Sequence, residues 1–174
     1  ICEFLLLGLC IGLGLLSKYT MVLFFPCALL YLYFEKNLNL LKKPGLWLAL
    51  LVSIIIFSPV IIWNYQHDFA SFVFQTKHGL SRQSYNWHWP LEYLAAQMGL
   101  MNPFLAVVGT TVAVKQFRKQ TLLATFGFFP ILFFLYSSFR SHVEPNWPLV
   151  AYPAIIALAF YSDSLWVKGS HFLS

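Results

Sequence analysis

The sequence predicts an all-α integral membrane protein: a multi-span helical bundle of about five to six membrane segments, in a single transmembrane domain over residues 1–174. Hydrophobic residues make up 59% of the chain and charged residues 10%, against about 45–50% and about 25% in soluble domains. The mean hydropathy is +0.69. The charges gather in short gaps between long apolar runs. This pattern excludes a water-soluble domain and a disordered chain.

Five apolar runs define the predicted segments, because a membrane helix needs about 20 apolar residues. The first run, 1–34, is interrupted by the polar residues 17–20, and a lysine in mid-bilayer is costly. We therefore expect two short segments there rather than one long helix. The other predicted spans are 46–63, 91–114, 122–139 and 149–167.

The lysine and arginine residues predict the orientation, because cytoplasmic loops carry the excess of positive charge. Seven fall on one side of the predicted spans: Lys36, Lys42, Lys43, Lys115, Arg118, Lys119 and Lys168. Four fall on the other: Lys18, Lys77, Arg82 and Arg140. The loops 64–90 and 140–148 are then outside, and we expect a multi-pass protein of the cytoplasmic (inner) membrane.

The outer loop 64–90 is predicted to contain a short interfacial helix. Phe69, Phe72, Val73 and Thr76 follow helical spacing, so that apolar side chains share one face. The preceding His67-Asp68 pair has the residue types of a general base, but neighbouring residues rarely face each other in that way. A cap at the start of the interfacial helix, with Asp68 at its N-terminus, is the favoured interpretation.

Six basic residues on the outer side are candidate ligands for a phosphate group. Lys18 either snorkels to the headgroups or binds a phosphate with its point charge. The cluster of Lys77, His78 and Arg82 in the outer loop either touches anionic headgroups or binds a substrate phosphate. The stretch 140–148 either only turns the chain, with Trp147 as an anchor, or meets a phosphate. The candidates are Lys18, Lys77, His78, Arg82, Arg140 and His142.

No metal site is predicted. The three cysteines contain no C-x-x-C pair, and the histidines lack metal-binding spacing. No cofactor is certain from the sequence, although a divalent metal stays open.

Three motifs resemble bacterial family 39 glycosyltransferases, relatives of the protein O-mannosyltransferases and of the lipid A aminoarabinose transferase. These are LGLLSKYT at 13–20, SPVIIWNYQHDFASF at 58–72 and EPNWPLVAYP at 144–153. The resemblance implies a GT-C type membrane enzyme that passes a sugar from a polyprenyl-phosphate donor to a lipid, glycan or protein acceptor on the outer face.

The resemblance also implies roles for individual residues. Lys18 matches a position near the carrier phosphate in relatives, and the basic residues of the outer loop match a second phosphate contact more loosely. The acidic catalytic base of the family lies in a first outer loop upstream of the region matched here. We therefore expect a fragment of a longer chain that lacks this loop and its catalytic residue, and that is inactive alone.

A polyprenyl-phosphate or lipid transporter is the alternative function. A flippase would place polar residues along a path through its spans. The predicted span 91–114 contains Glu92, Gln97 and Asn102, whereas the other spans are nearly bare of such residues. The partners in either case are the bilayer, a lipid-linked substrate and no nucleic acid.

Overall fold

A computed structural model describes the backbone of residues 1–80 and 86–170 and the side chains of residues 1–76 and 86–161. Every regular element in the described residues is helical, which confirms the all-α prediction. The contacts divide the chain into two compact units, Ile1–Ser81 and Arg82–Ser174.

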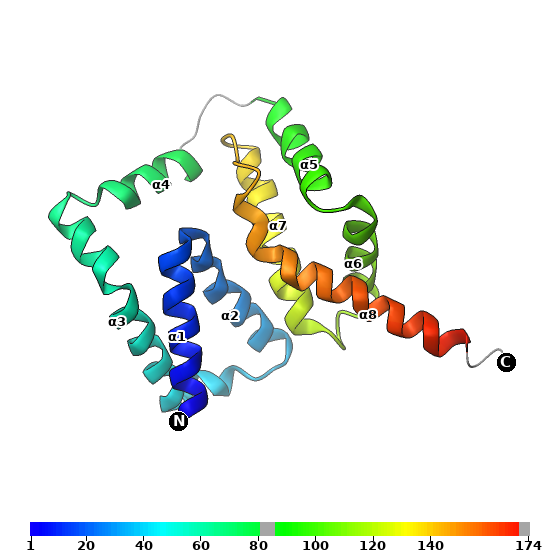
Figure 1. Ribbon diagram of the computed structural model, residues 1–174, viewed down its shortest axis with the longest axis horizontal. Helices are drawn as coiled ribbons and strands as arrows, with labels where there is room; N and C mark the ends of the chain where they lie inside the picture. The colour runs from blue at the N-terminus through cyan, green and yellow to red at the C-terminus, as the bar shows by residue number, and fades with distance from the viewer. Residues whose placement is uncertain (81–85, 171–174) are drawn as a thin grey trace. The chain divides into compact units, whose positions relative to one another are not determined.

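The described residues of the first unit contain four α-helices, of which the first three are joined by short 3₁₀ turns (Figure 1). Its elements are α1 (Cys2–Ser17), η1 (Tyr19–Leu23), α2 (Phe24–Phe34), η2 (Leu38–Lys42), α3 (Pro44–Gln66) and α4 (Ala70–Leu80). The apolar run 1–34 breaks at Lys18, where the backbone is extended (φ −158°, ψ 129°). The predicted division of this run into two short segments is confirmed.

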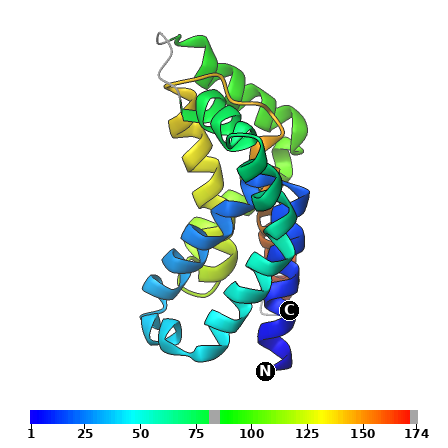
Figure 2. The ribbon, with the colours of Figure 1, turned by 90° about the vertical axis from the view of Figure 1, so that its left-hand side faces the viewer.

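Helices α1 and α3 lie side by side and run in the same direction (Figures 1 and 2). Two glycines of α1 allow this contact. A Cβ on Gly8 would lie 2.5 Å from the Ala49 carbonyl oxygen, and one on Gly12 would lie 2.7 Å from Cβ of Ile56. Small residues therefore let the two backbones approach closely, as in many membrane helix pairs.

Helix α3 continues through an internal proline. Pro59 has no N–H, so the carbonyl of Ile55, four residues earlier, loses its usual helical partner. The hydroxyl of Ser58 donates to that carbonyl at 2.7 Å. The local side chain thus replaces the missing backbone bond, which an apolar surrounding would otherwise leave unpaired.

A buried asparagine forms the corner between α3 and α4. Asn64 donates through Nδ2 to the Val60 carbonyl (2.9 Å) and accepts through Oδ1 from the N–H of Ser71 (3.1 Å). Its own carbonyl accepts from the N–H of Phe69 at 2.7 Å. The predicted helix in the loop 64–90 is confirmed as α4, but among the described hydrogen bonds Asn64, rather than the predicted Asp68, caps its start.

The second unit contains α5 (His88–Leu100), α6 (Pro103–Lys115), α7 (Thr121–Ser138), η3 (Trp147–Ala151) and α8 (Tyr152–Ser170). Helix α8 packs mainly against α6 and also contacts α7 (Figure 1). A buried cluster joins α6 to α7 and α8 through Val112, Ala113, Ala124 and Leu158. The connection 139–146 brings the chain back from α7 to η3.

The segment predicted as a span over 91–114 is divided into two helices, α5 and α6. The chain bends by 102° between α5 and α6. Asn102 caps α6 by accepting from the N–H of Phe104 at 2.9 Å, and Pro103 follows at the first helical position. An N-cap followed by proline starts a new helix, and we had counted both residues inside one span.

By length and composition, two of the described helices can cross a membrane, α3 and α7, and a third crossing is possible if α5 and α6 form one broken span. The other apolar segments of 10–17 residues are Cys2–Ser17, Tyr19–Phe34 and Trp147–Tyr161. The predicted number of about five to six segments thus includes these shorter helices.

Candidate functional site

Lys18 stands at the break between α1 and η1. Its backbone N–H donates to the Gly14 carbonyl at 3.0 Å, which closes α1, and its extended conformation starts the 3₁₀ turn. The side chain is half-buried, and this burial lowers the pKa of its ammonium from the ordinary value. A cation held partly away from water attracts an anion more strongly than a fully solvated one.

Thr20 adds a hydroxyl to the same break. Its Oγ1 is buried and has no hydrogen-bond partner in the described part of the chain. A buried hydroxyl without a partner is unfavourable by about 1–3 kcal/mol. The break therefore combines a cation with an unused donor two residues away, and the sequence analysis had assigned no role to Thr20.

Tyr19 joins this break to the end of the unit where α3 meets α4. Its ring makes edge contacts with Phe57 of α3 and with Phe72 of α4, at centroid distances of 6.5 and 6.0 Å. Lys18 is therefore at the same end of the unit as the start of α4. The side chains of Lys77 and His78, in the last turns of α4, and the whole of Arg82 lie outside the described residues.

His67 packs on the preceding turn of α3. Its ring stacks on Trp63 with centroids 4.1 Å apart and an interplanar angle of 11°. Its Nδ1 lies 2.7 Å from the Trp63 carbonyl oxygen. Through these contacts the His67 ring packs on the end of α3.

In the second unit, Arg140 and His142 follow α7. The guanidinium carbon of Arg140 lies 4.9 Å from the centre of the Tyr136 ring, a cation–π contact. Arg140, His142 and Glu144 are exposed, whereas Ser141 and Val143 between them are buried. This alternation is typical of an extended segment with one covered face, so the three ionisable side chains share the other face.

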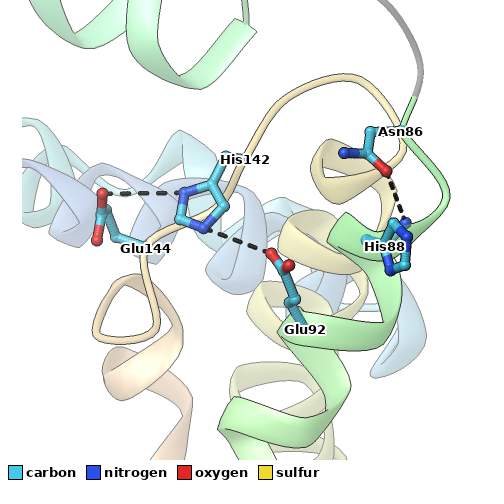
Figure 3. Close-up of polar contacts among 5 residues, drawn as sticks. All are labelled: Asn86, His88, Glu92, His142 and Glu144. Atoms are coloured by element: carbon cyan, nitrogen blue, oxygen red, sulfur yellow. Dashed lines mark hydrogen bonds and ion pairs between the residues drawn. The ribbon is translucent and has the colours of Figure 1, made fainter.

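His142 lies between two carboxylates (Figure 3). Its Nε2 is 3.8 Å from Oε2 of Glu92 on α5, and its Nδ1 is 4.0 Å from Oε1 of Glu144. About half of each of these side chains is exposed. Asn86 fixes the start of the same helix, because its Oδ1 accepts from the N–H of His88 at 3.0 Å.

The acidic neighbours of His142 limit its chemistry. A phosphate brought to this ring would also approach two carboxylates, and like charges repel. A hydroxyl or an ammonium group would instead meet two acceptors. The geometry thus favours Arg140 over His142 as a phosphate ligand. In the described part of the chain, no group of three His, Cys, Asp or Glu residues could hold a metal ion.

Comparison with known proteins gives two similarities. The model of the dolichyl-phosphate-mannose-protein mannosyltransferase family matches residues 1–63, the segment that contains the break at Lys18. The lipid A galacturonosyltransferase RgtD of Rhizobium johnstonii is 25% identical over 173 residues. That alignment covers 95% of this chain and 36% of the relative, so the chain spans about a third of the relative's length. No solved structure matches.

The resemblance to the GT-C glycosyltransferases is confirmed. The apolar helices are those of a multi-pass membrane protein. Of the candidate residues, the GT-C match contains Lys18 alone, because it ends at residue 63.

A buried polar network holds the second unit together. Gln97 on α5 accepts from the Tyr152 hydroxyl at 2.7 Å and donates to the Pro145 carbonyl at 3.2 Å. Tyr93, one turn earlier, donates to the Ile131 carbonyl at 2.9 Å. We missed this network, because its members are 38 to 55 residues apart in the chain. The polar Gln97 inside an apolar helix was its one visible signal.

Proposed function

We propose that the protein is a membrane glycosyltransferase that takes a sugar from a polyprenyl-phosphate donor and transfers it to a lipid, glycan or protein acceptor on the outer face. The observation that carries the proposal is the break at Lys18 inside the segment that matches the mannosyltransferase family model. The family description names a dolichyl-phosphate sugar, which is a polyprenyl-phosphate donor.

The chemistry of the break fits the phosphate of such a donor. The prenyl chain needs an apolar surrounding, which α1 and α2 provide on both sides of Lys18. The ammonium of Lys18 would pair with the phosphate, and the Thr20 hydroxyl would donate to one of its oxygens. Neutralising the phosphate also favours its departure as the sugar leaves.

Arg140 is proposed as a second phosphate contact. It is exposed after α7, and its guanidinium can donate two parallel hydrogen bonds to a phosphate. Lys77, His78 and Arg82 remain proposed phosphate contacts from the predicted outer loop 64–90. His142 also remains a proposed contact, with the weaker support described above.

The alternative function, a flippase, has less support. A transporter would direct the polar side chains of α5 toward an aqueous path. Instead, Gln97 and Tyr93 use their polar atoms in bonds to Pro145, Tyr152 and Ile131. These bonds hold neighbouring segments together and do not present polar atoms to a passing substrate.

Replacement of Lys18 in the full-length protein tests the proposed function. We expect Lys18→Ala to raise the KM for the polyprenyl-phosphate donor by about 10- to 100-fold, because a charge-assisted hydrogen bond contributes about 1.5–3 kcal/mol. Lys18→Arg should retain part of the affinity. Lys42→Ala, which removes an exposed lysine beyond α2, is the matched control. A normal donor KM for Lys18→Ala would show that Lys18 only snorkels.

A further inference from the structure

The turn between α6 and α7 carries three cations that the glycosyltransferase proposal does not use. Lys115 ends α6, and Arg118 and Lys119 follow before α7 begins at Thr121. All three are exposed. The stretch 93–143 contains no Asp or Glu, so these cations have no acidic partner within their own helical hairpin.

The same turn is hollowed. Residues 114–119 line a hollow of about 400 Å³, which is within the size range of small-molecule sites. Gln116, one of the lining residues, has a buried Oε1 with no hydrogen-bond partner in the described residues. Its backbone is already used: its N–H donates to the Val112 carbonyl (2.8 Å), and its carbonyl accepts from the N–H of Lys119 (2.8 Å).

These features define the ligand chemically. Three cations require an anion, and a buried amide oxygen requires a donor. The turn opens α7, one of the two described helices long enough to cross a membrane, so we expect it at a membrane surface, where lipid headgroups are the most abundant anions. In a headgroup with both a phosphodiester and a hydroxyl, the phosphodiester can pair with the three cations and the hydroxyl can donate to the amide oxygen.

We propose that the α6–α7 turn binds an anionic phospholipid with a hydroxyl-bearing headgroup, of the phosphatidylglycerol type. Lys115, Arg118 and Lys119 contact its phosphodiester, and the Gln116 side chain turns toward the hollow so that a headgroup hydroxyl donates to its Oε1. This site is at the opposite end of α6 and α7 from Arg140 and is independent of the sugar chemistry. The alternative is that these cations bind no specific lipid and only reflect the excess of Lys and Arg in the cytoplasmic loops of membrane proteins.

Native mass spectrometry of the full-length protein tests the site. The probes are phosphatidylglycerol, phosphatidylcholine and phosphatidylmethanol, the last an anionic lipid without headgroup hydroxyls. We expect retention of phosphatidylglycerol above both others. The double variant Arg118→Gln/Lys119→Gln should lower its occupancy by about tenfold or more, since each cation near a surface contributes about 1 kcal/mol. Gln116→Leu should remove the preference for phosphatidylglycerol over phosphatidylmethanol.

The matched control is Lys42→Gln/Lys43→Gln, which removes two exposed cations from another connection. An equal loss in this control, or equal retention of phosphatidylcholine by the unmodified protein, would overturn the site. Competition by soluble glycerol phosphate at the same concentration as the lipid would also overturn the lipid assignment. Asp163→Asn, which changes the acidic residue of α8, is a further control variant. It should retain phosphatidylglycerol as the unmodified protein does, and a loss of lipid retention in this variant would contradict the proposal.

Discussion

The hydroxyl of Tyr152 donates to Oε1 of Gln97 at 2.7 Å, although the two residues are 55 positions apart in the chain. Because the opposite atom of the same amide donates to the Pro145 carbonyl, one side chain links α5, the connection after α7 and the start of α8. The EPNWPLVAYP motif is thereby held at both of its ends by a residue that lies outside it.

We expect Tyr152→Phe and Gln97→Leu each to lower the free energy of unfolding by about 1–3 kcal/mol, because each leaves a buried polar group unpaired. The double variant should lose less than the sum, since both changes break the same bond. Thermal unfolding in one detergent measures all three, with the exposed Tyr136→Phe as control. Additive losses would show that the bond contributes little.

The close contact of α1 with α3 gives a second prediction. Gly8→Ala should destabilise the protein by about 1–3 kcal/mol, because the new methyl group would overlap a backbone oxygen. Gly99→Ala is the matched control, since nothing lies within 4 Å of a Cβ at that glycine. That control should be neutral or slightly stabilising, by about 0.4–1 kcal/mol. Equal melting temperatures for the two variants would refute the packing argument.

The predicted topology is open to labelling. With the native cysteines replaced, a cysteine at Asn146 should react with a membrane-impermeant reagent in intact cells, and a cysteine at Lys119 should react only after permeabilisation. Both residues are exposed, whereas Ser141 is fully buried and therefore unsuitable. Labelling of Lys119→Cys alone in intact cells would reverse the orientation.

Arg140 gives a kinetic prediction of its own. If Arg140 contacts the donor phosphate, Arg140→Ala should raise the donor KM, because its guanidinium can donate two parallel hydrogen bonds to a phosphate. The measurement is the donor KM of the full-length protein with and without the substitution. An unchanged donor KM for Arg140→Ala would remove Arg140 from the proposed phosphate contacts.

Local chemistry explains what could be predicted from the sequence. The break at Lys18 followed from a cation inside an apolar run, and α4 followed from the spacing of Phe69 and Phe72. The bend before α6 could also have been predicted, because Asn102-Pro103 is typical of a helix start. We missed it because we assigned the span from the number of apolar residues alone.

Contacts between distant segments explain the rest. Asn64 caps α4 only because the chain turns back on itself after α3, so a search for caps immediately before the helix selected Asp68. The carboxylates around His142 come partly from α5, 50 residues earlier in the sequence. No spacing rule pairs residues over such distances, and the acidic surroundings of that histidine were therefore not predicted.

The pairing of Ser58 with the carbonyl that Pro59 leaves free has an evolutionary consequence. The two residues act as one unit, since the hydroxyl is needed only while the proline is present. Among homologues, a proline at this position should be accompanied by serine or threonine immediately before it. Sequences that have lost the proline should be free to carry alanine or leucine there. The first two letters of the SPVIIWNYQHDFASF motif would then be inherited together as a structural repair, with no part in substrate binding.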